Sequence, residues 1–286
     1  MRARAEWALL GLAVIWGSTF VVIKAALTGI SPMLFIAARF TIAALVLVPL
    51  YRRRLRRSAI PGGVLVGVLL FVAFVLQTEG LALTTPSKSA FLTGLSIPMV
   101  PFVNSVVYRT RPQIPEVVGI LIASFGMALM TLPSGRFEMT RGDLLSLLCA
   151  IAFAVQFVAL SHFSKSAGFE TVSVMQVAVT AVLAILSVLT FGGTRFEPGI
   201  GLGAAVLATG LLATALAFTA MAWAQQFTTP VRAALILALE PAVAWLTSWA
   251  VTGEVLSMRG KMGAALILAG VLLVELKRSK PETLDI

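Results

Sequence analysis

The chain has 286 residues, of which 59% are hydrophobic and 12% are charged. A soluble domain of this length is closer to half apolar and a quarter charged, so a water-soluble fold is excluded because too few charges remain to cover its exterior. The 22 Lys and Arg residues exceed the 12 Asp and Glu residues. In a membrane protein such an excess gathers in cytoplasmic loops, which accounts for the basic charge without nucleic-acid binding.

The sequence offers little material for catalysis or metal binding. Cys149 is the one cysteine and His162 the one histidine, so neither a disulfide framework nor a thiol metal site can form. The chain contains no H-E-x-x-H, no G-x-S-x-G, no P-loop and no Asp-rich metal motif. We therefore expect no enzyme activity, no metal and no cofactor.

Turn residues divide the chain into long apolar runs, and a helix across the bilayer needs about 20 such residues. The basic segment Met1–Glu6 leads directly into the first run, which we interpret as an uncleaved span rather than a signal peptide. A β-barrel would need short alternating segments instead. The predicted spans are, in chain order, 6–26, 32–50, 61–83, 86–107, 115–132, 142–162, 172–190, 200–223, 230–250 and 258–276.

The basic residues predict how these spans are oriented. The densest cluster, Tyr51–Arg57, follows the second predicted span, and Arg2, Arg4, Lys277 and Arg278 flank the two ends of the apolar region. Basic residues concentrate on the cytoplasmic side of a membrane protein. We therefore expect the chain to lie in the inner membrane of the cell, with both termini in the cytoplasm.

The two halves of the chain repeat one another. Thr84–Ala90 aligns without gaps with Thr228–Ala234, and in the same register Gly119 and Gly126 align with Gly263 and Gly270. The first helices align more loosely, and there Trp16 meets Phe153, Phe20 meets Phe157, and Arg39 meets Gln176.

The repeat predicts the architecture. The first repeat covers residues 1–135 and the second covers 136–286, each with five predicted spans. Because five is odd, the second repeat must cross the membrane in the opposite sense. The predicted fold is an all-α integral membrane protein of ten transmembrane helices, arranged as two inverted five-helix repeats. Transporters commonly have this architecture, with the substrate site between the repeats.

Polar and aromatic side chains in the middle of predicted spans are candidates for that site, because the membrane makes an ionisable residue there costly. Glu240 precedes Pro241 in the ninth span. It is either a cavity carboxyl that binds an amine or a proton, or a protonated or paired carboxyl at a kink. Trp16 is either part of a cavity wall that stacks on a ligand or part of the packed core. We add Gln77, Gln156 and Trp223 to the predicted substrate-binding set.

Charged residues elsewhere in the spans are candidates for gating or charge pairing. Arg39 lies about 10 Å inside the second span, and it either pairs with Glu79 or holds a substrate carboxylate. Lys24 is a further candidate for gating or charge pairing, or it extends to the interface. Lys88 and Arg232 follow the matched prolines of the two repeats. They are either a gate charge on each side of the membrane or interfacial anchors.

The motifs resemble a known family. Trp16–Phe20 reads Trp-Gly-Ser-Thr-Phe and resembles the W-G-[S/T]-x-F signature of the EamA-type drug/metabolite transporter superfamily. Glu240-Pro241 followed by Gly253-Glu254 resembles the end of its second repeat. The first half departs from that pattern, since Arg109-Thr110 stands where a Gly-Glu pair is expected. The resemblance extends over about residues 6 to 277, and within the superfamily the chain looks most like the YddG-type exporters.

The resemblance implies a function. We expect an inner-membrane transporter that exports amino acids or related small metabolites by alternating access through a central cavity. One alternative is a carrier of drugs or of other metabolites such as nucleotide sugars on the same fold. An alternative of another class is a membrane enzyme or lipid-handling protein. The expected partners are a small-molecule substrate and the lipid bilayer, with no nucleic acid, and we expect a monomer.

Overall fold

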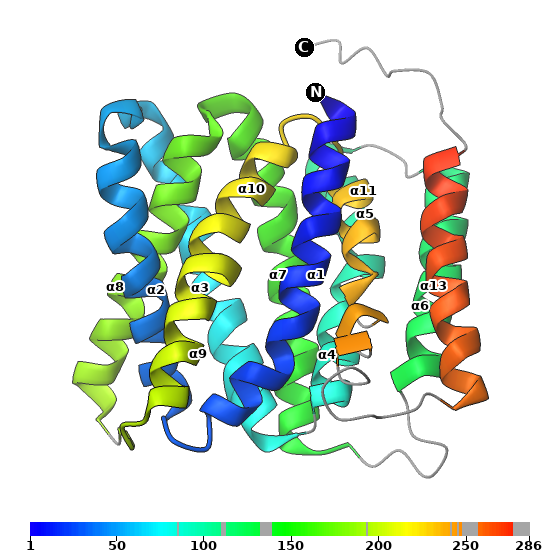
Figure 1. Ribbon diagram of the computed structural model, residues 1–286. Helices are drawn as coiled ribbons and strands as arrows, with labels where there is room; N and C mark the ends of the chain where they lie inside the picture. The colour runs from blue at the N-terminus through cyan, green and yellow to red at the C-terminus, as the bar shows by residue number, and fades with distance from the viewer. Residues whose placement is uncertain are drawn as a thin grey trace.

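The chain folds into one bundle of long helices that run alongside one another (Figure 1). The computed structural model describes residues 1–84, 86–109, 113–131, 139–192, 194–240, 242–244, 246–247 and 257–276, without the side chains of 86–88, 130–131, 167 and 274–276.

The first half contains α1 (Arg2–Ala26), α2 (Pro32–Tyr51), the short turns η1 (Arg52–Arg54) and η2 (Arg57–Ala59), α3 (Ile60–Leu83), α4 (Pro86–Gly94), α5 (Ser96–Tyr108) and α6 (Ile114–Thr131). The second half contains α7 (Arg141–Ala167), α8 (Phe169–Phe191), α9 (Ile200–Gly210), the π-helix η3 (Leu211–Leu216), α10 (Ala217–Ala224), α11 (Pro230–Leu237) and α13 (Met258–Leu276).

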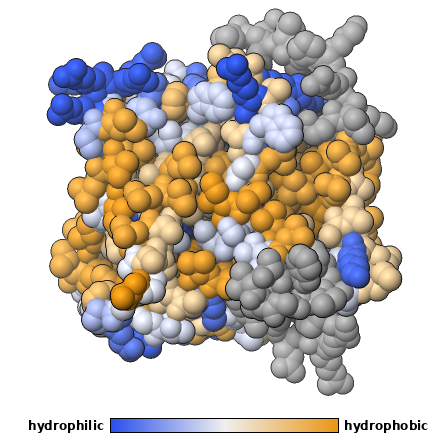
Figure 2. Space-filling model, viewed as in Figure 1, coloured by the Kyte–Doolittle hydropathy of each residue, from blue (hydrophilic) through white to orange (hydrophobic). Residues whose placement is uncertain are grey.

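The outside of the bundle is built to face lipid. Large apolar side chains point outward along its length, among them Leu45, Phe102 and Leu189. Figure 2 shows a hydrophobic band across the visible face, with hydrophilic residues gathered toward the two ends of the bundle. Within the described residues, seven helical stretches are long and apolar enough to cross a membrane. An exposed apolar belt of this extent is not found on soluble monomers. The chain is therefore a multi-pass membrane protein.

The last helices of the two halves pack against each other through glycine. A Cβ on Gly126 of α6 would lie 2.6 Å from the carbonyl oxygen of Gly263 on α13, and a Cβ on Gly270 would lie 2.5 Å from the carbonyl oxygen of Gly119. Only a residue without a side chain allows two helices to approach so closely. The four glycines are the matched pairs of the sequence repeat, so α6 and α13 present equivalent surfaces to each other.

Two predicted spans are interrupted where a proline removes a hydrogen-bond donor. The predicted span 86–107 divides into α4 and α5 at Leu95, because Pro98 has no N–H to donate to the Gly94 carbonyl. The predicted span 230–250 contains α11, which ends at Leu237. Pro241 likewise has no N–H for the Leu237 carbonyl, and a turn at 238–239 separates α11 from further helical residues. Each run was predicted as one span whose prolines indicate a break in the first run and a kink in the second, and the structure places these interruptions at Leu95 and after Leu237.

The predicted span 200–223 is also irregular. It includes the π-helix η3 between α9 and α10, where one extra residue is accommodated in the helical turn. Such π-segments occur often at functional sites, and this one lies beside the cavity described below.

The two ends of the bundle differ in packing. The N-terminus of α1 and the last turn of α13 lie at the same end (Figure 1), which we call the N-terminal end. There Leu9 and Leu12 of α1 share one buried cluster with Val231 and Leu235 of α11. Side chains therefore fill the bundle at the N-terminal end.

Candidate functional site

A cavity of about 90 Å³ lies inside the bundle, in the half farther from the N-terminal end. A single water needs about 10–15 Å³ by the same measure, so the space holds a ligand of several non-hydrogen atoms. Its wall combines aromatic rings with a few polar groups, the usual composition of a small-molecule site. The aromatic residues are Trp16, Phe20, Phe74, Phe153, Phe157 and Phe218, and the polar residues are Thr19, Arg39, Gln77, Thr78, Thr93, Ser96 and Glu240.

The two helix interruptions deliver one polar residue each to this cavity. Ser96 begins α5 directly after the break at Leu95, and Glu240 follows the turn that ends α11. The sequence repeat matches Ser96 with Glu240. Interrupted helices in corresponding positions of two repeats are typical of transporter substrate sites, because the breaks place polar groups near the middle of the membrane.

Arg39 is a buried cation whose partners in the described part of the chain are neutral. Its Nε donates to Thr214 Oγ1 at 2.5 Å and its Nη2 donates to the Ala213 carbonyl at 3.0 Å. Its guanidinium carbon lies 4.9 Å from the ring centre of Phe74 and 5.7 Å from that of Phe40. Aromatic faces stabilise a cation without neutralising it. Arg39 therefore contributes a positive charge to the cavity wall.

Trp16 is held by the same carbonyl group. Its Nε1 donates to the Ala213 oxygen at 2.9 Å, and its ring lies 5.3 Å from that of Phe218. Trp16 therefore fits both predictions made for it, since it packs against the core and also lines the cavity.

Glu240 is brought to the cavity by a close approach of α1. A Cβ on Gly17 would lie 2.6 Å from the Glu240 carbonyl oxygen and 3.0 Å from the Cβ of Val243. The glycine of the Trp16–Phe20 motif therefore lets α1 contact the segment that carries Glu240. Glu240 and Arg39 both line the cavity without an ion pair between them.

The predicted pairing of Arg39 with Glu79 is wrong, because the partners of Arg39 are Thr214 and Ala213. The cation whose charge acts on Glu79 is Arg141, at the start of α7. Lys24 binds backbone rather than a carboxylate. Its Nζ donates to the carbonyl oxygens of Leu81, Ala82 and Thr84 at 2.8, 3.1 and 2.9 Å. An ammonium there stabilises the C-terminal end of α3, where carbonyl groups lack helical partners.

Gln77 lines the cavity, as predicted, but two other residues of the predicted substrate-binding set do not. Gln156 is fully buried, and its Nε2 donates to Gln176 Oε1 at 3.1 Å. Trp223 packs on Phe227 with ring centres 5.4 Å apart. Neither residue touches the cavity, so a role in substrate binding would require a rearranged conformation.

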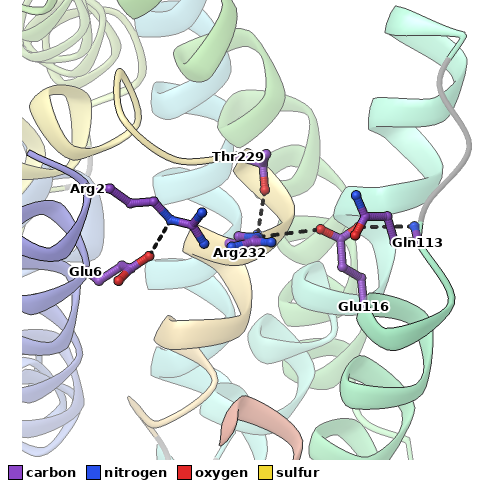
Figure 3. Close-up of polar contacts among 6 residues, drawn as sticks. All are labelled: Arg2, Glu6, Gln113, Glu116, Thr229 and Arg232. Carbon is purple, nitrogen blue, oxygen red and sulfur yellow. Dashed lines mark hydrogen bonds and ion pairs between the residues drawn. The ribbon is translucent and has the colours of Figure 1, made fainter. Parts of the chain in front are cut away.

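Arg232 lies at the N-terminal end, where Figure 3 shows it facing Glu116 of α6. Its Nε is 3.9 Å from Glu116 Oε1, both side chains are largely buried, and the Gln113 N–H donates to Glu116 Oε2 at 3.2 Å. Arg2 forms a second ion pair in the same view, with Glu6 at 2.8 Å.

The ion pair between Arg232 and Glu116 connects α11 to α6 at the N-terminal end, where side chains fill the bundle. The side chain of Lys88, its counterpart in the repeat, lies outside the described residues.

Three functional residues were not predicted from the sequence. Thr214 and Ala213 hold Arg39 and Trp16, yet both lie in an ordinary apolar run. Glu116 stands near a predicted helix start, where an acidic residue is common, so nothing in its position suggested a buried partner. Ser96, by contrast, was marked in the sequence by Pro98, which interrupts the span two residues later.

Comparisons with known proteins agree with this architecture. The model of the EamA-like transporter family matches residues 3–132 and, a second time, residues 140–276. The chain belongs to the EamA-like transporter family. The two matches cover nearly the whole described bundle, one in each half. Family membership identifies the chain as a membrane transporter.

Named relatives of this EamA-like protein are transporters as well. A protein of Archaeoglobus fulgidus named "Uncharacterized transporter" is 33% identical over 276 residues, which cover 96% of this chain and 87% of the relative. The "Uncharacterized inner membrane transporter YedA" of Escherichia coli is 25% identical and covers 94% and 90% of the two chains. A solved crystal structure superposes with a TM-score of 0.81 at 21% identity, over 96% of this chain and 98% of that chain, which shows a shared fold.

Proposed function

We propose that this protein exports amino acids or closely related zwitterionic metabolites across the inner membrane by alternating access. The observation that carries the proposal is one cavity with a cation, Arg39, and a carboxyl group, Glu240, on its wall. An amino acid presents a carboxylate and an ammonium group that complement these two residues. The surrounding aromatic rings suit its apolar side chain.

The proposed architecture has ten transmembrane helices in two inverted repeats. It is supported by the equivalent glycine contacts of α6 with α13, by the equivalent interruptions after α4 and α11, and by the two family matches. The N-terminus of α1 and the end of α13 lie on one side (Figure 1), as an even number of crossings requires. The arginine-rich turn η1 follows α2 at that same end, so we place both termini in the cytoplasm.

Alternating access is supported by the different packing of the two ends. The buried cluster of α1 and α11 and the ion pair between Arg232 and Glu116 close the N-terminal end. The cavity lies beyond them, nearer the opposite side. A cytoplasmic substrate reaches the cavity only after this end opens, so we assign Arg232 and Glu116 to the cytoplasmic gate. Lys88 remains a proposed gate residue for the other side.

The cavity size favours small metabolites over nucleotide sugars. A space of about 90 Å³ matches several non-hydrogen atoms but not a nucleoside diphosphate. A drug carrier remains the second candidate because the wall is mostly aromatic.

Counterflow in liposomes tests the proposal. The purified full-length protein is reconstituted, the vesicles are loaded with unlabelled leucine, and accumulation of labelled leucine is followed over time. We expect saturable exchange of leucine that Arg39→Met lowers about ten-fold or more, because a lost hydrogen bond or ion pair to a charged ligand group costs about 1.5–3 kcal/mol. Arg195→Met is the matched control, since Arg195 lies in an exposed loop and donates to the Leu27 carbonyl away from the cavity.

A panel of amino acids with small, branched and aromatic side chains extends the counterflow assay. Exchange of none of them would refute the proposal. Exchange of an apolar drug-like cation, with no exchange of any amino acid, would favour the function of a drug carrier.

A further inference from the structure

The π-helix η3 leaves one carbonyl group without its usual helical partner. In an α-helix the Ala217 N–H would donate to the Ala213 carbonyl, four residues earlier. Here the Ala217 N–H donates to the carbonyls of Leu212 and Thr214 instead. The Ala213 oxygen is therefore available to side chains from other helices, although it lies inside a continuous helical segment.

That carbonyl receives side chains from two helices of the other half. Trp16 of α1 donates to it from Nε1 at 2.9 Å, and Arg39 of α2 donates to it from Nη2 at 3.0 Å. A buried carbonyl oxygen has two lone pairs, and these two donors match them. The π-helix of the second half thus holds the tryptophan and the arginine of the first half at fixed positions on the cavity wall.

The next residue, Thr214, has a hydroxyl group that is oriented to accept from Arg39. Its Oγ1 donates its proton to the Thr209 carbonyl at 2.8 Å. With the proton directed there, the lone pairs of Oγ1 are free to accept from Arg39 Nε at 2.5 Å. Both contacts use the Nε and Nη2 edge of the guanidinium, so Nη1 keeps its protons for a ligand. These two acceptors are neutral and leave the charge of Arg39 intact.

We infer that η3 is a positioning element that holds Arg39 for a carboxylate on the substrate, and that Thr214 determines selectivity for carboxylate-bearing ligands. A guanidinium binds a carboxylate well only in the correct plane and direction. Two hydrogen bonds on one edge and the Phe74 ring on one face define that plane. This inference builds on the proposed function, since it assigns the partner of Arg39 in the same cavity, but it can be tested without transport.

The test uses three ligands that share one apolar group. Leucine carries a carboxylate and an ammonium, isovalerate carries only the carboxylate, and isoamylamine carries only the ammonium. Apparent affinities are measured from ligand-induced thermal stabilisation of the purified full-length protein in detergent. The variants are Thr214→Val, which keeps the shape of the side chain but removes the acceptor, and Thr214→Ser, which restores it. Thr190→Val is the matched control, because Thr190 makes a similar contact to the Leu186 carbonyl at an exposed position.

We expect Thr214→Val to weaken leucine and isovalerate about ten-fold while isoamylamine changes by less than about two-fold. Thr214→Ser should return the wild-type pattern, and Thr190→Val should leave it unchanged. If Thr214→Val does not fold, Thr214→Ala provides the same comparison.

An equal loss for all three ligands would mean a merely structural role and would overturn the inference. So would wild-type affinity for isovalerate in Thr214→Val, or the absence of any isovalerate binding to the wild type. Failure of leucine counterflow, with Thr214-dependent isovalerate binding preserved, would overturn the proposed amino-acid transport and leave the positioning role intact.

Discussion

The contact between α1 and the segment that carries Glu240 depends on Gly17, and Gly17→Ala tests it directly. The added Cβ would lie 2.6 Å from the Glu240 carbonyl oxygen and 3.2 Å from the Ala244 nitrogen, whereas ordinary contacts begin at 3.4 Å. The obstacles are these two backbone atoms and the Cβ of Val243 at 3.0 Å, none of which can turn aside as the end of a flexible side chain does. One of the two segments must therefore move by about 0.8 Å, a shift comparable to those that overpacking mutations cause in protein cores.

The expected cost follows from this overlap. Overpacking of this kind costs about 1–3 kcal/mol, and the displacement also shifts the segment that carries Glu240, a residue of the cavity wall. We expect the free energy of unfolding to fall by that amount and leucine counterflow to fall with it. The measurement is equilibrium unfolding in mixed detergent micelles, followed by helical circular dichroism and combined with counterflow in liposomes.

Gly11→Ala on the same helix is the matched control. A Cβ on Gly11 meets nothing within 4 Å, and alanine favours a helix over glycine by about 1 kcal/mol. We therefore expect Gly11→Ala to be neutral or stabilising and to transport normally. Equal stability and equal transport in Gly17→Ala and Gly11→Ala would refute the close contact, and with it the role assigned to the glycine of the motif.

Three more substitutions separate the roles of cavity and scaffold. Glu240→Gln removes the carboxylate at nearly constant shape, so leucine should bind about ten-fold more weakly. The affinity for isovalerate, which has no ammonium, should stay within about two-fold. An equal loss of affinity for both ligands, measured by thermal stabilisation, would argue against an ammonium site. Arg39→Lys retains the charge but lacks the planar fork that binds two acceptors and a carboxylate together, so we expect leucine affinity to fall about ten-fold by the same assay, and wild-type affinity would contradict the geometric argument. Gly126→Ala should lower the free energy of unfolding by about 1–3 kcal/mol, because its Cβ would meet the backbone of α13 at 2.6 Å. Gly203→Ala, whose Cβ meets nothing within 4 Å, should not, and similar values for the two would show that α6 and α13 approach less closely.

The sequence predicted the scaffold well because hydropathy and glycine spacing report directly on packing against lipid and between helices. The described helices begin and end close to the predicted spans, and the matched glycines Gly126 and Gly270 lie in helix contacts. The interior of the spans was predicted unevenly. Hydropathy alone does not show the interruptions at Leu95 and after Leu237, but the prolines near them indicate a break and a kink, whereas no residue type marks the π-helix at Leu211–Leu216.

The partners of the charged residues were the least predictable part of the site. Arg39 was expected to pair with Glu79 and Lys24 either to pair or to extend to the interface, but both bind backbone carbonyl groups. A cation in the membrane is satisfied by any acceptor that the fold provides, and which carbonyls lack a helical donor depends on irregularities such as η3. Glu79 was placed beside Arg39 by its depth in the sequence alone, and depth does not report which way a side chain points around its helix; the cation that acts on Glu79 is Arg141.

The aromatic part of the cavity follows the repeat. Trp16 aligns with Phe153 and Phe20 aligns with Phe157, and all four residues line the cavity. Each half therefore contributes the same two ring positions from its first helix. Such a wall gives a ligand apolar contacts from both halves, but it does not favour one orientation of the ligand over the other.

The charged part of the cavity breaks that symmetry. Arg39 aligns with Gln176, which is buried against Gln156 rather than at the cavity, and Glu240 aligns with the uncharged Ser96. The first half thus supplies only the cation and the second half only the carboxyl group. A zwitterion bound between them has one favourable orientation, and each of its charged groups contacts a different half.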